Sequence, residues 1–276
     1  MNAIPLSCKA EGWRAALTLR LAPRGARTQL IERAHVGPLV VQRPFYPEGE
    51  VCHVYLVHPP GGIVGGDELS LQVAVERGAH ALVTTPAATK LYRSEGALAV
   101  VRQALEVEEA ALEWLPQENI YFKAARVRSA TTVALRGGAR FIGWEITCLG
   151  RPAGGEAFGE GMLRLGFELA VDGQPRVVDR LRIDGDNAAR AAVWGLSSCT
   201  AIGTLLAYPA DGALRESVRS EGHDMAVACS IVDEVLVCRV LGAQAEPVKQ
   251  ALTRIWQRIR PVLLGREAAL PRIWQT

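Results

Sequence analysis

The chain has 276 residues, of which 49% are hydrophobic and 22% charged, so it carries enough apolar surface to order a core. Lys and Arg exceed Asp and Glu by only 31 to 29 and are scattered, which excludes a continuous basic track for nucleic acid. Six cysteines without CxxC spacing are typical of reduced thiols, not of a disulfide framework or a zinc knuckle.

Targeting and membrane segments are not evident. The N-terminal residues lack the charged-then-apolar order of a secretory signal, and no run approaches the roughly 18 apolar residues of a membrane span. We therefore expect a cytoplasmic protein with no membrane partner. No internal repeat or linker divides the chain, so we expect one domain over residues 1–276.

Alternating apolar and polar residues predict a first strand from Trp13 to Leu21. Similar short runs follow at 51–57, 69–75, 81–85, 97–105, 126–135, 141–148, 163–171 and 176–183. Turn signals separate them, above all Asp172-Gly173, which is typical of a hairpin. No long helical pattern lies between successive strands. The sequence therefore predicts a mainly β fold of layered or sandwich-like antiparallel sheets.

About two helices are expected towards the C-terminus. Apolar residues at three-and-four spacing predict an amphipathic helix over 246–260, ended by Pro261 and Gly265. A shorter helix is predicted over 211–220, with strands at 225–231 and 235–240. The stretch 188–208 is ambiguous, because its glycines oppose its helical pattern.

A glycine-rich loop, HPPGGIVGGDE from His58, lies between two predicted strands. Its G-x-x-x-x-G spacing resembles a P-loop, but Asp67-Glu68 stands where Lys and Ser or Thr are needed, and a strand follows instead of a helix. His53, His58 and Asp67 could make a metal-dependent hydrolase. Because residues five apart on a strand point to opposite faces, His53 and His58 share a site only if the chain bends.

Other enzyme signatures are absent. The segment TTPAATKLYRS from Thr84 has no His or acid at a distance that would activate a nucleophile. Glu118 and Glu145 each follow an aromatic residue in strand-like surroundings, so both can be partly buried. Each of these carboxylates can either form a salt bridge to an arginine or serve a function, and the sequence leaves both alternatives open. A β-rich module for carbohydrate or another small ligand is a third possibility, which a 6% aromatic content disfavours.

Six segments, in this order, resemble the urease accessory protein family UreD, called UreH in some bacteria. They are VGPL with VQRPFYPE from Val36, the HPPGGIVGGDE segment, TTPAATKLYRS, LEWLPQENIYF from Leu112, CLGRPAGGEAF from Cys148, and the closing LPRIWQT. The resemblance spans almost the whole chain. It implies a β-rich protein without enzymatic activity that docks on the urease apoprotein (UreABC) together with UreF and the GTPase UreG.

The resemblance also implies a water-filled passage for Ni²⁺, with no tightly bound cofactor. Such a passage needs weak, spaced oxygen ligands, since the ion must keep moving. The acids beside the matching segments that we expect to serve it are Asp67, Glu68, Glu145, Asp179 and Glu118, with the hydroxyl of Thr89 as a weaker choice.

Aromatic residues and Arg are enriched at the centres of obligate interfaces. The helix at 246–260 with Trp256, and the tail with Arg272 and Trp274, are therefore predicted to contact UreF. Ordinary packing onto the sheets is the alternative.

Overall fold

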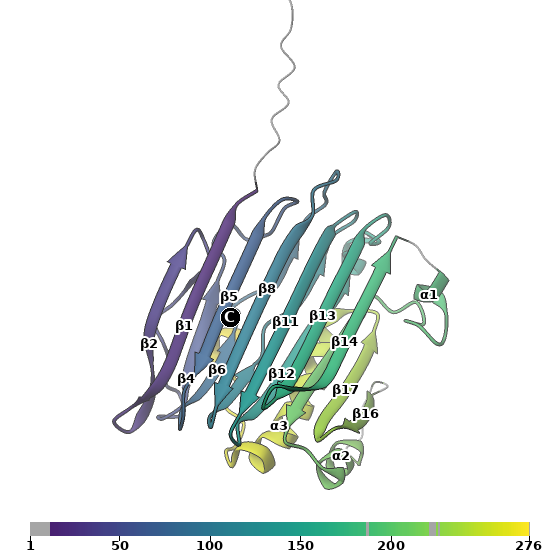
Figure 1. The fold of residues 1–276 in the computed structure, drawn as a ribbon. Helices are drawn as coiled ribbons and strands as arrows, with labels where there is room; N and C mark the ends of the chain where they lie inside the picture. The colour runs from purple at the N-terminus through teal and green to yellow at the C-terminus, as the bar shows by residue number, and fades with distance from the viewer. Residues whose placement is uncertain (1–11, 186–187, 221–224, 226, 276) are drawn as a thin grey trace, which may run out of the picture.

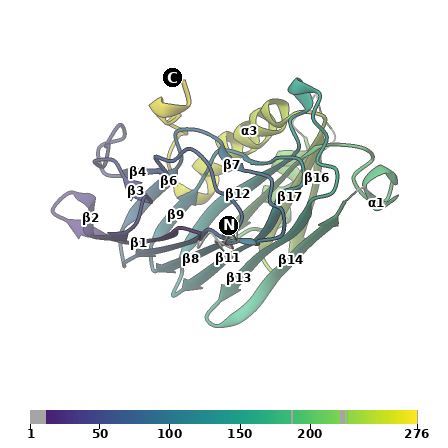
Figure 2. The ribbon, with the colours of Figure 1, turned by 90° about the horizontal axis from the view of Figure 1, so that it is seen from above.

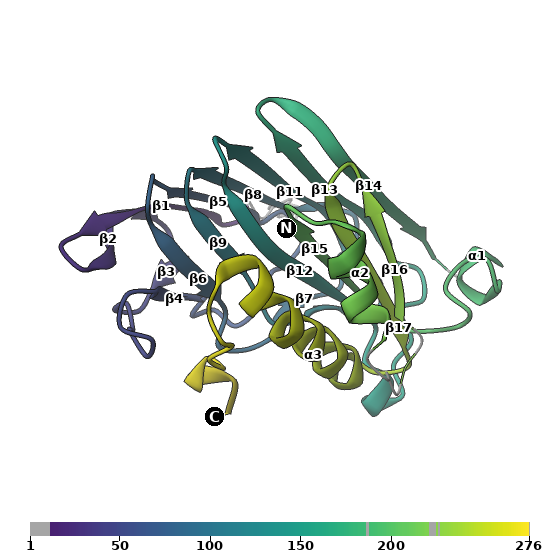
Figure 3. The same cartoon turned by 90° about the horizontal axis from the view of Figure 1, so that it is seen from below.

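The computed structural model describes residues 12–185, 188–220, 225 and 227–275. Two β-sheets lie face to face, and helices cover the outer face of one of them (Figure 1 and Figure 3). The predicted mainly β class, with two helices near the C-terminus, is confirmed.

The first sheet has seven strands in the order β14-β13-β11-β8-β5-β1-β2. In chain order they are β1 (Arg14–Arg24), β2 (Arg27–Val36), β5 (Glu68–Val75), β8 (Ala99–Glu108), β11 (Arg126–Arg136), β13 (Met162–Val171) and β14 (Gln174–Asp184). Burial alternates along most of them, as for strands with one wet face. Among the described residues, no helix lies on the outer face of this sheet (Figure 2).

The second sheet has ten strands, and its main path runs β16-β17-β15-β12-β9-β6-β4-β3. Its strands are β3 (Val40–Val41), β4 (Cys52–Val57), β6 (His80–Thr84), β7 (Thr89–Leu91), β9 (Ala111–Trp114), β10 (Asn119–Tyr121), β12 (Arg140–Leu149), β15 (Ala201–Tyr208), β16 (Val227–Val232) and β17 (Val235–Gly242). Strands β4, β6 and β12 are buried along most of their length, because this sheet is covered on both faces.

The expectation of antiparallel neighbours is wrong for the centre of both sheets. Strands β1, β5, β8, β11 and β13 pair in parallel, as do β4, β6, β9 and β12. The reason is that the chain alternates between the sheets here: between two parallel neighbours of one sheet it passes through at least one strand of the other. The turns at Gly78 and Gly137 change sheets, although in sequence they look like hairpin turns.

Hairpins form where the chain stays in one sheet. The predicted turn at Asp172-Gly173 joins antiparallel β13 and β14, and both residues have positive φ, 49° and 79°. Strand β2, which the sequence pattern did not reveal, pairs with β1 through a turn at Gly25.

Two apolar layers hold the fold together. The first lies between the sheets and contains inward side chains such as Leu17, Leu71 and Val133. The second lies between the second sheet and the helices, and it contains Trp144 and Leu252. The second sheet is thus the shared wall of both layers.

The helices follow the prediction with one correction. Helix α2 (Gly212–Arg219) begins at Asp211, whose carboxylate accepts a hydrogen bond from the Leu214 amide, 2.8 Å. Helix α3 (Ala245–Leu264) continues through Pro261, where it was expected to end. A proline so near the end removes only one helical hydrogen bond, and the helix stops at Gly265, whose φ is 67°. None of the described helices is long and apolar enough to cross a bilayer.

The ambiguous stretch 188–208 contains the short helix α1 (Ala188–Ala191), a series of turns and then strand β15. The predicted strands at 225–231 and 235–240 correspond to β16 and β17, although residue 226 lies outside the described residues. Short 3₁₀ helices occur at Pro152–Gly154 and Arg272–Gln275.

Candidate functional site

A first cavity of about 370 Å³ lies between the two sheets. Its walls come from β5 and β8 on one side and from β4, β9 and β12 on the other. Apolar side chains dominate, with a few polar groups among them, including His58, Lys90, Gln103 and Glu145.

The glycine-rich loop closes one side of this cavity. Gly61 has a φ of 77°, and a Cβ at Gly65 would lie 2.2 Å from the Ser94 hydroxyl oxygen. The backbone of Ile63 bonds to Lys90 and Tyr92, so the loop pairs with the TTPAATKLYRS segment. Gly65 therefore allows close packing between these two segments, and Gly61 allows the positive φ of the turn.

A second cavity of about 490 Å³ continues between the sheets, beneath β13, β14, β15 and β17. Asp179 and Arg239 line it and form an ion pair with an N–O distance of 3.1 Å. Glu145 lines this cavity as well as the first. Two interior cavities thus share Glu145 as a lining residue.

Glu145 is surrounded by protein but faces both cavities. Burial raises the pKa of its carboxyl group to about 7; a hydrogen bond from Thr131 lowers it, and the charge of Asp179 raises it. The Thr131 hydroxyl contacts both Glu145 and Gln103 Oε1, the latter at 2.7 Å. A hydroxyl has one proton, so when Thr131 donates to Gln103, a protonated Glu145 supplies the other hydrogen bond. The carboxyl group can therefore exchange a proton near neutral pH.

The predicted acids do not form one cluster. Asp67 is buried in the turn, where its two oxygens accept hydrogen bonds from the amides of Trp13 and Val64, at 2.8 and 2.9 Å. Glu68 is exposed on the first sheet, with Arg102 3.9 Å away. The structure thus brings Glu145 and Asp179 together at one cavity, while Asp67 serves the turn.

Glu118 lies directly before β10 and next to Thr89, the first residue of β7. The Thr89 amide donates to the Glu118 carbonyl, 2.9 Å, and Thr89 lines the first cavity. The charge of Glu118 adds to burial in raising the pKa of the Cys148 thiol.

The residues of the alternative hydrolase are separated. His58 lines the first cavity, whereas His53 lies on the opposite face of β4, where its Nε2 contacts Glu48 Oε1 at 2.7 Å. Asp67 is engaged by two backbone amides. Within the described part of the chain, no group of three or more His, Cys, Asp or Glu side chains could hold a metal ion. The geometry argues against a hydrolytic metal centre here.

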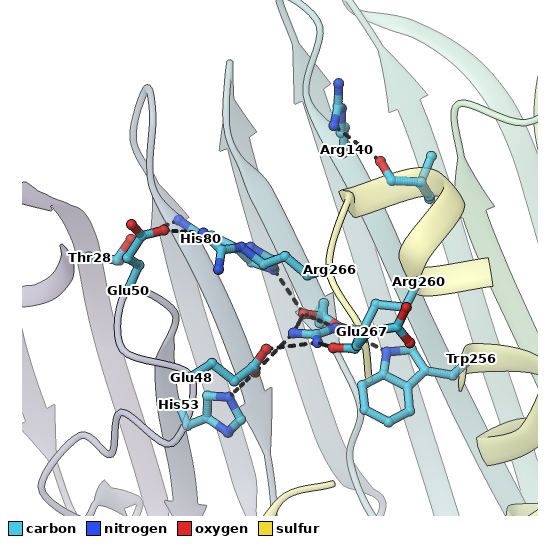
Figure 4. A network of polar contacts seen from close by, with 12 residues as sticks. Thr28, Glu48, Glu50, His53, His80, Arg140, Trp256, Arg260, Arg266 and Glu267 are labelled. Atoms are coloured by element: carbon cyan, nitrogen blue, oxygen red, sulfur yellow. Dashed lines mark hydrogen bonds and ion pairs between the residues drawn. The ribbon is translucent and has the colours of Figure 1, made fainter. Parts of the chain in front are cut away.

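A buried charge network joins α3 to the second sheet (Figure 4). Arg260 of α3 reaches Glu113 on β9 and Glu48, which lies before β4. The Arg260 guanidinium, fully buried, contacts Glu113 at 2.9 Å and Glu48 at 2.8 Å. His80 Nε2 and Trp256 Nε1 also reach Glu113, at 2.8 and 2.6 Å.

Burial opposes ionisation of both carboxyl groups in this network, but their partners outweigh it. Hydrogen bonds from His53 and Arg260 hold the pKa of Glu48 at about 2, and His80 and Arg260 lower that of Glu113. Both carboxylates are therefore charged and satisfied at neutral pH.

Comparison with known proteins shows to which family this sequence is related. The family model described as UreD urease accessory protein matches residues 14–275. The chain is similar to the Urease accessory protein UreD of Klebsiella pneumoniae, with 44% identity over 271 residues that cover 96% of each chain. It is also similar to the protein of that name in Alcanivorax borkumensis, at 42% identity over 96% of this chain and 93% of the relative.

This chain belongs to the UreD family. The resemblance seen in the sequence is thereby confirmed. The family's name indicates an accessory role for urease and not catalysis by the chain itself.

The three residues predicted to contact UreF differ in how far they are buried. Trp256 is fully buried against Glu113, so its side chain cannot contact a partner directly, which corrects that expectation. Its helical spacing is equally typical of a core position. Trp274 is partly buried; its Nε1 donates to Thr84 Oγ1 at 2.9 Å, and its ring lies against Trp144 and Trp256. Arg272 is exposed.

The sequence did not reveal the roles of Glu48, Glu113 and Arg260. Glu113 and Arg260 are 147 positions apart in the chain, and no local pattern connects them. The one available signal was an arginine at an apolar position of the predicted helix, which needs a buried carboxylate partner.

Proposed function

We propose that this chain is a scaffold of urease maturation that docks on the urease apoprotein together with UreF and UreG. Ni²⁺ passes through its interior as cargo on the way to the urease active site. The membership in the UreD family supports the accessory role. The observation that carries the passage is that the two interior cavities share Glu145.

The lining of the cavities suits an ion that must keep moving. Glu145, Asp179 and neutral hydroxyls such as Thr204 offer oxygen atoms separated along the walls. Divalent cations such as Mg²⁺ and Mn²⁺ are held by carboxylates and water, whereas a closed His and Cys cage would retain nickel. Asp179 is already paired with Arg239, which weakens its hold on a cation. The ion is thus a passenger and not a resident cofactor.

Co-expression with urease, UreF and UreG, with and without this chain, tests the accessory role. We expect nickel per urease active site to fall strongly without the chain. Glu145→Gln, which keeps the side-chain shape but removes the charge, should slow loading, whereas Glu108→Gln on the exposed end of β8 should not. Full loading without the chain would refute the proposal.

The partner surface is proposed at the tail. Arg272 is exposed and lies two residues before the partly buried Trp274, so Arg272→Glu should weaken capture of UreF while leaving the fold intact. Unchanged capture by this variant would remove the tail from the interface.

A further inference from the structure

The hairpin formed by β16 and β17 lies at the edge of the second sheet and carries two cysteines opposite each other. The sulfur atoms of Cys229 and Cys238 are 3.0 Å apart. Among the described cysteines, only these two have their sulfurs in contact.

The register of the hairpin favours a bond between the two sulfurs. Asp233 and Glu234 form a two-residue turn in which both φ angles are positive, 44° and 65°, and such a turn is flanked by a hydrogen-bonded pair. The pairs then alternate without a bulge, so Cys229 and Cys238, the fourth pair from the turn, are not hydrogen-bonded. The Cα atoms of such a pair are about 4.5 Å apart, within the range of about 4.4 to 6.8 Å that disulfides span.

The two thiols differ in environment. Cys238 is buried beneath the helices, whereas Cys229 is half-buried on the edge strand. A hydrogen bond from Cys238 lowers the pKa of Cys229, with Arg219 of α2 adding to the effect against burial. The pKa of Cys238 is raised by its hydrogen bond to Cys229 and by burial. Cys229 is thus the more accessible and the more readily ionised of the two thiols, and Cys238 is placed to react with it.

We propose that Cys229 and Cys238 form a reversible redox site that a peroxide oxidises to a disulfide. The Cys229 thiolate attacks a peroxide oxygen, so that an S–O bond forms, the O–O bond breaks and hydroxide leaves. The Cys238 sulfur then attacks the Cys229 sulfur; the S–S bond forms, the S–O bond breaks, and the hydroxyl leaves as water with the Cys238 proton. Two electrons pass from the sulfurs to the peroxide, and a dithiol reductant reverses the reaction.

The crosslink acts on a wall of the second cavity. Ala228 and Arg239, the immediate neighbours of the two cysteines, line that cavity from the other face of the same strands. A disulfide fixes the edge strand to β17 at this point, so oxidation stiffens the hairpin that holds Arg239 against Asp179.

The test uses the full-length chain with Cys8→Ser in every sample, because Cys8 lies outside the described residues. The folded protein is treated with hydrogen peroxide, alkylated and mapped by peptide mass spectrometry. We expect the loss of two thiols per chain, at Cys229 and Cys238 together, a peptide linked through them, and full recovery with dithiothreitol. Cys199, a half-buried single thiol, is the internal control and should form no such link.

Two further samples separate geometry from general reactivity. In Cys238→Ser, oxidation should stop at a sulfenic acid on Cys229 that dimedone traps. In urea, the preference for the Cys229–Cys238 link should disappear. The proposal is overturned if both thiols survive peroxide that oxidises Cys199, if Cys229 links to another cysteine instead, or if unfolding leaves the yield of the link unchanged.

Discussion

The protonation state of Glu145 changes near neutral pH, because burial raises its pKa from 4.5 to about 7. Between these values the folded chain keeps a proton that the unfolded chain has released, so stability falls as pH rises through this range. Glu145→Gln removes this titration. We expect the free energy of unfolding of the wild type, relative to the variant, to drop by about 1 to 3 kcal/mol across it. Urea titrations at several pH values measure this, and parallel curves would argue against a buried, titrating carboxyl group.

Asp67 was predicted to serve the passage, but in the structure its carboxylate stabilises the turn. Its carboxylate holds the backbone amides of Trp13 and Val64, so Asp67→Ala should cost about 3 kcal/mol of unfolding free energy. Glu68→Ala, at the exposed neighbouring position, should stay within about 0.5 kcal/mol of the wild type. Thermal unfolding compares the two variants. Equal stability would mean that the turn does not depend on this carboxylate.

Residue types and local spacing predicted part of the surroundings of Glu145. An acid beside an aromatic residue in a strand-like run indicated that its side chain is partly buried, which the structure confirms, whereas its choice for the passage came from the family resemblance. Asp67 was chosen in the same way because it ends the glycine-rich loop, but its backbone partners, one of them 54 positions away, cannot be seen in a sequence. The same limit hid the pairing of Arg260 with Glu113.

At the scale of elements, strand positions could be predicted, but strand partners could not. Alternating polarity gives the period of a strand and says nothing about which sheet it enters. A turn such as Gly137-Gly138 is short enough for a hairpin, yet it carries the chain from β11 in one sheet to β12 in the other. Helix α3 was predicted because its apolar face repeats with helical period, and only its passage through Pro261 was not.

Arg260 links helix α3 to the second sheet through its ion pairs with Glu113 and Glu48, so these ion pairs should stabilise the packing of the helix on the sheet. Arg260→Ala leaves Glu113 and Glu48 buried without their main cationic partner, and we expect a loss of about 3 to 5 kcal/mol. Arg258→Ala, on the exposed face of the same helix, should change stability by no more than about 0.5 kcal/mol. Denaturant unfolding followed by tryptophan fluorescence measures both. Similar midpoints for the two variants would contradict a stabilising role for the network.

At the scale of the whole molecule, the two sheets enclose cavities with partly polar walls. A fully packed sandwich would have no such cavities. The cavities arise because facing strands of different sheets fail to fill the space around Glu145. No sequence pattern predicts such a space, since it depends on how the sheets lie against each other. The family resemblance implied a passage, and the cavities provide the place in which to test it.

Blocking the second cavity tests the account most directly. Thr204 lies opposite Glu145 in the β12–β15 register and lines this cavity, so Thr204→Phe should obstruct it, whereas Thr204→Val keeps its size. Thr132→Phe places the same ring on the exposed face of the first sheet. The measurement is nickel per urease active site in cells that express each variant, with capture of UreF checked in parallel. We predict strongly reduced loading for Thr204→Phe alone; normal loading by this variant, folded and bound to UreF, would contradict transport through the interior.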